Sequence, residues 1–153
     1  MDKSLKRSYL YTAILATAVV ALAVPPSATH ARSKADDAFF EAVGNADFRC
    51  GLASGTYALA KEYRASSLAT DREKVTTCLV EGRSSMIEAL KAIPNDDANK
   101  ALRDAAKKVY SAWGPYSGFL SQGVSFRQVE ASPVTREFKQ ALSEYGTELE
   151  LAN

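Results

Sequence analysis

The two cysteines are the side chains of this chain with the most evident chemistry. Cys50 and Cys78 are separated by 27 residues, and the sequence holds no third cysteine. Two cysteines in a small exported domain usually form a disulfide, so we predict a Cys50–Cys78 bond, which contributes about 3 to 4 kcal/mol in the chain-entropy model. Gly51, Gly55 and Gly82 stand near these cysteines and would let two helices approach as closely as the bond requires.

The other reactive side chains form no recognisable catalytic or metal-binding pattern. The single histidine, His30, falls in the predicted export signal, so the mature chain lacks the commonest general base and metal ligand. With both cysteines bonded, no thiol nucleophile remains. The sequence therefore predicts no catalytic residue, no metal site and no cofactor.

The carboxylates have a structural explanation. Asp36-Asp37 and Asp96-Asp97 are neighbours in sequence, so on a helix they point about 100 degrees apart, and negative charge is favoured where a helix starts. Glu144 and Glu148 share a helix face, but no motif beside them suggests a substrate pocket. We therefore expect a protein that is not an enzyme.

The best candidates for binding are the aromatic residues around Gly114-Pro115. Trp113, Tyr116 and Phe119 lie on either side of this break, and aromatic side chains are enriched at protein-binding hot spots. We predict that they form a contact surface, together with the connection that runs to Ala131. The alternative is that Trp113 and Phe119 fill the core.

The N-terminus indicates export. Three basic residues, Lys3, Lys6 and Arg7, precede an uncharged run from Leu10 to Val24. As a helix this run spans about 22 Å, short of the roughly 30 Å hydrocarbon core of a bilayer. Residues 1–31 therefore read as a signal peptide cleaved after Ala31, for a periplasmic or secreted protein.

Three alternatives at the N-terminus stay open. Cleavage could instead follow Ala28. The segment from Lys6 to Leu10 resembles a twin-arginine export signal in which lysine replaces the first arginine. The apolar run could also remain attached as a membrane tether.

Residues 32–153 are long enough for one domain with a core of its own. Without the signal, the chain holds 16 Lys and Arg against 17 Asp and Glu, with both signs interspersed. This balance lacks the excess of basic residues that is typical of proteins that bind nucleic acid or an anionic membrane surface.

Apolar periodicity predicts the helices that would position these residues. The first spans about 36–64, with one apolar stripe that runs from Phe39 through Cys50 to Ala60. A break is possible at Gly44-Asn45, where both residues disfavour helix. The second begins at Asp71 behind a capping box of Thr70 and Glu73, and Pro94 ends it.

The third helix begins after Asp96-Asp97 and is interrupted at Gly114-Pro115. A connection over 122–131 follows, with a possible short extended segment. Ser132-Pro133 then starts the last helix, as N-cap and first helical residue. The predicted fold is all-α: a small antiparallel bundle of about four amphipathic helices, held by one disulfide.

These observations favour a non-enzymatic, exported protein-interaction module, of the general kind seen in inhibitors and immunity proteins. Its partner would be another envelope or extracellular protein. The alternative function is a carrier of small apolar ligands, with a pocket inside the bundle lined by Tyr57, Met86, Trp113 and Phe119. The sequence specifies neither the partner nor the oligomeric state.

Overall fold

The computed structural model describes residues 34–152, and within them the fold is all-helical, as predicted. The predicted signal peptide, residues 1–31, lies outside the described residues. The helices are α1 (Lys34–Glu62), α2 (Leu68–Ala92), α3 (Lys100–Leu120), α4 (Phe126–Ala131) and α5 (Pro133–Leu151). No helix among them combines the length and apolar character needed to span a bilayer.

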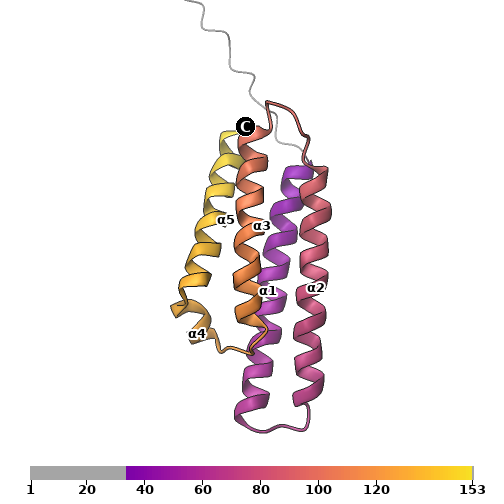
Figure 1. Cartoon of the computed structure of the whole chain (residues 1–153), viewed down its shortest axis with the longest axis vertical. Helices are drawn as coiled ribbons and strands as arrows, with labels where there is room; N and C mark the ends of the chain where they lie inside the picture. Colours follow the sequence, from indigo (N-terminus) through magenta and orange to yellow (C-terminus); the bar gives the residue numbers. More distant parts are fainter. Residues whose placement is uncertain (1–33, 153) are drawn as a thin grey trace, which may run out of the picture.

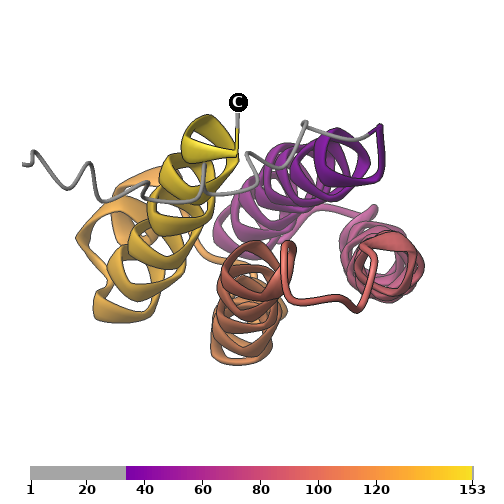
Figure 2. The ribbon, with the colours of Figure 1, turned by 90° about the horizontal axis from the view of Figure 1, so that it is seen from above.

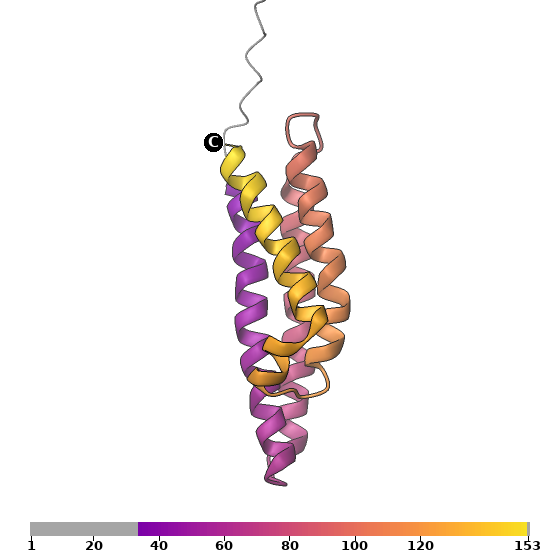
Figure 3. The same ribbon diagram turned by 90° about the vertical axis from the view of Figure 1, so that its left-hand side faces the viewer.

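The four long helices form two closely packed pairs. Helix α1 runs antiparallel to α2, and α3 runs antiparallel to α5, while contacts between the pairs are sparser (Figure 1). Figure 2 shows the pairs end-on, with α4 beside the start of α5. The α1–α2 hairpin extends beyond the ends of α3 and α5 (Figure 3). The lower part of α1 is therefore less covered than its upper part.

Helix α1 is continuous across Gly44-Asn45. Both residues are exposed, and a side chain at Gly44 would meet no atom within 4 Å. After Glu62 the chain leaves the helix through Arg64, whose φ of 52° is left-handed. The amides of Arg64 and Ala65 bond back to the carbonyls of Lys61 and Ala60, which is the Schellman pattern.

Helix α2 begins three residues earlier than predicted, so the expected capping box was wrong. Ser67 is the N-cap, and its carbonyl accepts the first helical hydrogen bond, from the amide of Asp71 at 2.8 Å. Hydrogen bonds from the side chains of Ser67 and Lys74 lower the pKa of Asp71. Thr70 and Glu73 are exposed residues of the first turns.

Helix α3 passes through Gly114-Pro115 without interruption, contrary to the prediction. Proline removes the hydrogen bond to the carbonyl four residues earlier, here that of Ser111. Ser111, Gly114 and Pro115 are all exposed, so water can bond to that carbonyl. A proline on the outer face therefore does not end this helix.

The connection over 122–131 contains helix α4 instead of an extended segment. A capping box starts it: the Ser125 hydroxyl accepts from the Gln128 amide, and the Gln128 side chain accepts from the Ser125 amide. The predicted start of the last helix at Ser132-Pro133 is confirmed.

The Cys50–Cys78 disulfide is confirmed and joins α1 to α2 with the two Cα atoms 5.5 Å apart. Its position along the hairpin follows from the short 63–67 connection, because Cys50 and Cys78 are nearly equidistant from its centre. The helices meet closely at Gly82, where an added Cβ would lie 2.8 Å from the Cβ of Ala46.

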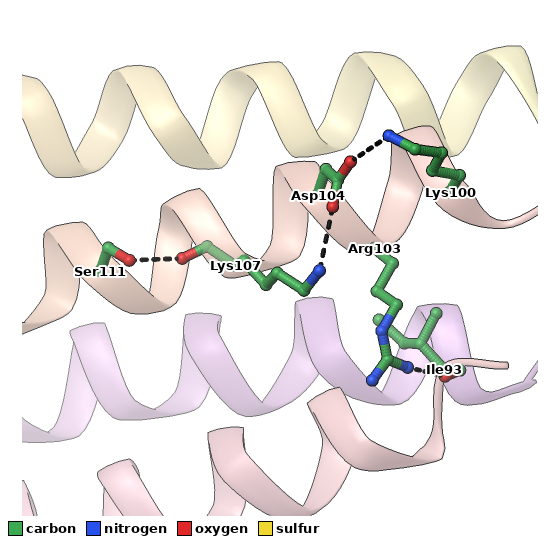
Figure 4. A network of polar contacts seen from close by, with 6 residues as sticks. All are labelled: Ile93, Lys100, Arg103, Asp104, Lys107 and Ser111. Carbon is green, nitrogen blue, oxygen red and sulfur yellow. Dashed lines mark hydrogen bonds and ion pairs between the residues drawn. The ribbon is translucent and has the colours of Figure 1, made fainter. Parts of the chain in front are cut away.

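Arg103 holds the connection between α2 and α3, and a cluster of charged residues lies beside it on α3 (Figure 4). The Arg103 guanidinium donates to the carbonyl of Ile93 at the end of α2. Hydrogen bonds from Lys100 and Lys107, and their charges, lower the pKa of Asp104 to about 2. The two lysines are engaged within their own helix and do not form an open anion site.

We expect loss of the disulfide to reduce the free energy of unfolding by about 3 kcal/mol, because the unfolded chain regains loop entropy. Urea unfolding of the Cys50→Ser/Cys78→Ser variant measures this change. Dithiothreitol should destabilise the wild type to the same extent and leave the double variant unaffected. Equal stability of the oxidised protein and the variant would contradict the prediction.

We expect Gly82→Ala to lower the free energy of unfolding by about 1 to 3 kcal/mol, since the new methyl group overlaps Ala46. Gly44→Ala is the matched control. It also replaces a helical glycine but meets open space, so it should raise stability by up to about 1 kcal/mol. The same urea experiment measures both, and shifts of the same sign would rule out the close contact as the cause.

Candidate functional site

The structure places Trp113 and Tyr116 in the core, where they are 2% and 1% exposed. Tyr116 stacks on Phe138 of α5 with ring centroids 4.5 Å apart, and Trp113 packs edge-on against both rings. No partner can touch these two rings without opening the bundle. Their observed role is to pack α3 against α5.

Tyr116 also joins the two helix pairs. Its hydroxyl donates to the Oδ1 atom of Asp47 on α1 at 2.6 Å. Burial raises the pKa of Tyr116, and the hydrogen bond and negative charge of Asp47 raise it further. The phenol therefore stays protonated and acts as a hydrogen-bond donor across the bundle.

Phe119 is half-buried against the core, so it offers little surface to a partner. In the stretch from Trp113 to Ala131, the large apolar side chain that the structure exposes is Phe126, at the start of α4. Trp113, Tyr116 and Phe119 therefore do not form an exposed aromatic surface around Gly114-Pro115.

A second apolar stripe lies on the outer side of α1. Its members are separated by four, seven and four residues, so they share one helix face directed away from the core. Together with Phe126 they form a surface that we call the α1 face. It comprises Phe48 (72% exposed), Leu52 (51%), Leu59 (55%), Tyr63 (73%) and Phe126 (60%).

Phe126 joins this face because α4 is held against α1. Its ring covers Gly55, where an added Cβ would lie 3.2 Å from the Cε2 atom of the ring. The Ser54 hydroxyl donates to the carbonyl of Leu120 at 2.7 Å and accepts from the amide of Val124 at 3.0 Å. This buried serine therefore fixes the path from α3 to α4.

Three charged residues close to the α1 face in sequence bond to groups outside it. Arg49 reaches Glu81 of α2 at 3.4 Å, and Asp47 accepts from Tyr116. Lys61 donates to the carbonyl of Gln122 at 2.8 Å and lies over the Tyr57 ring. These three side chains therefore do not cover the apolar residues, and the exposed residues Glu62 and Arg127 border the face.

The surface hollows between α1 and α2 hold no recognisable catalytic or metal-binding group among the described residues. Two adjoining surface hollows of about 450 and 510 Å³ share Arg49, Cys78 and Glu81. The Arg49–Glu81 ion pair spans them, and small side chains line much of the remainder. Within residues 34–152 no group of three or more His, Cys, Asp or Glu residues is placed to hold a metal ion.

Sequence reasoning missed the α1 face because it assigned one apolar stripe to the first helix. That stripe, from Phe39 through Cys50 to Ala60, is indeed the buried one. A second count at helical spacing from Phe48 would have found the outer stripe. Helix α1 is therefore apolar on two faces, and the expectation of a simple amphipathic helix was wrong for it.

No protein-family model, curated protein or solved structure matches this chain.

We expect Tyr116→Phe to lower the free energy of unfolding by about 1 to 3 kcal/mol, because the half-buried Asp47 loses its donor. Tyr116→Ala should cost about 3 to 5 kcal/mol, since a cavity is left against Phe138. Tyr110→Phe is the matched control: its hydroxyl accepts from Arg83 at the surface, so its loss should cost under about 0.5 kcal/mol. If Tyr116→Ala and the wild type unfold at the same urea concentration, Tyr116 is not packed in the core.

Proposed function

We propose that this protein is an exported, non-enzymatic helical module that binds a protein chain through the α1 face. The observation that carries the proposal is the row of large apolar side chains along the outer side of α1. Soluble monomers rarely expose contiguous apolar patches of several hundred Å², and such patches commonly mark interaction sites. Aromatic residues, three of the five here, are also enriched at interfaces.

The support for each part of the proposal differs. The export part rests on the N-terminal sequence, in which three basic residues precede an uncharged run, and a disulfide is compatible with an oxidising compartment. The non-enzymatic part rests on the sequence argument, since both cysteines are bonded and the histidine lies in the predicted signal.

The carrier alternative loses support because its expected pocket is filled. Met86 and Trp113, two of its four predicted lining residues, are packed in the hydrophobic core. Tyr57 instead lies against the backbone of Gly123, so closely that its ring leaves no room for a Cβ there. An apolar ligand would have to displace these contacts to enter.

We expect the Phe48→Gln/Leu59→Gln variant to capture at least tenfold less of the protein's partner than the wild type does. Burial of each wild-type side chain on binding would contribute about 1.5 to 3 kcal/mol. Immobilised oxidised protein is incubated with the envelope fraction and medium of its own cells, and bound protein chains are quantified. Both substitutions are at exposed positions, so circular dichroism should show an unchanged fold.

The matched control is Val80→Gln/Leu151→Gln, which removes two side chains of similar exposure from α2 and α5. This variant should capture as much as the wild type. If the two double variants behave alike, the proposed function is overturned. It is also overturned if the wild type captures nothing above an uncoated matrix and sediments as a monomer.

A further inference from the structure

We infer that the occupant of the α1 face is a second copy of this chain, in a two-fold dimer whose α1 helices lie antiparallel. The inference rests on the proposed function, because it names the partner for the same face. Three features of the face support a second copy: the symmetry of its spacing, the position of Phe126 near its centre, and its area.

The spacing of the face is symmetric about one point of α1. Phe48 and Tyr63 lie equally far from the midpoint between Gly55 and Thr56, and Leu52 and Leu59 do so as well. A two-fold interface must be complementary to itself. In an antiparallel pair centred on this midpoint, Phe48 meets the partner's Tyr63, and Leu52 meets the partner's Leu59.

The middle of the face is occupied by the Phe126 ring, which covers Gly55 on one side of the midpoint. The other large side chains lie toward both ends of the face. The dimer axis brings equivalent sides of the two α1 helices together, so the two Phe126 rings would face each other across it.

The exposed area is sufficient for a dimer. Whole aromatic side chains present about 150 to 250 Å² each, so the five partly exposed members of the face offer about 600 Å². A standard interface buries about 800 Å² per partner. The face supplies most of this area, and the polar residues beside it would form the rim. The α1–α2 hairpin projects beyond α3 and α5, so those helices leave its lower part uncovered (Figure 3).

Sedimentation equilibrium of the purified oxidised protein alone should show a dimer. Leu52→Arg and Leu59→Glu should each weaken dimerisation at least tenfold, because each buries an unpaired charge against a leucine of the partner. Val80→Arg, a new charge at an exposed position of α2, should leave the dimer intact.

A mixture of the Leu52→Arg and Leu59→Glu variants tests the antiparallel register. In the mixed dimer the arginine introduced in one chain meets the glutamate introduced in the other, and the second pair remains leucine with leucine. Dimerisation should therefore recover at least tenfold. Failure of the mixture to recover would overturn the antiparallel register. If the wild type stays monomeric, or if Leu52→Arg leaves the dimer unchanged, the α1 face is not occupied by a second copy of the chain.

The outcomes separate this inference from the proposed function. If the wild type is monomeric but still captures another protein in a manner sensitive to Phe48→Gln/Leu59→Gln, the inference fails and the proposed function stands. If the protein is monomeric and capture does not depend on the face, both fail.

Discussion

The disulfide between Cys50 and Cys78 is the constraint on which the rest of the structure depends. It holds the α1 and α2 backbones within 5.5 Å at that point, a separation that leaves no room for large side chains between them. Ala46 and Gly82 meet this requirement beside the bond. Between α3 and α5 the packing is different, because Trp113, Tyr116 and Phe138 form one cluster of rings there. The α1–α2 pair thus has a covalent bond at its closest approach, and the α3–α5 pair has ring packing.

A small number of polar contacts fixes the two pairs relative to each other. The Tyr116 hydroxyl donates to Asp47, and the Tyr145 hydroxyl donates to the backbone carbonyl of Asp36 at 2.9 Å. Ser54 bonds to the loop that leaves α3. Hydrogen bonds are directional, so these contacts set the rotation of α1 about its own axis, which apolar packing alone specifies less strictly. That rotation decides which of the two apolar faces of α1 is buried and which one faces solvent.

The features that sequence reasoning predicted correctly depend on local chemistry. Cys50 and Cys78 have one possible pairing within the chain, and Ser132-Pro133 is a helix start wherever its surroundings permit. The features that it missed depend on what lies around the residue. Pro115 does not end α3, and it lies with Ser111 on the exposed side of that helix. The Ser125 and Gln128 capping box was present in the sequence but was not recognised. For the candidate site the difficulty was of a different kind. Phe48 and Phe39 are the same residue type on one helix, and only the position of α2, α3 and α5 determines that Phe39 is buried and Phe48 exposed.

An outward apolar stripe makes the orientation of α1 ambiguous, and the disulfide removes this ambiguity. A helix that is apolar on two faces has two alternative ways to pack against the same neighbours, with either stripe turned inward. The Cys50–Cys78 bond excludes one of them, because Cys50 belongs to the inner stripe and can meet Cys78 only when that stripe faces the bundle. The bond therefore specifies orientation as well as adding stability. In this view the two cysteines and the α1 face belong to one arrangement: the covalent link commits one face of α1 to the core, and the other face is left available for a second protein chain.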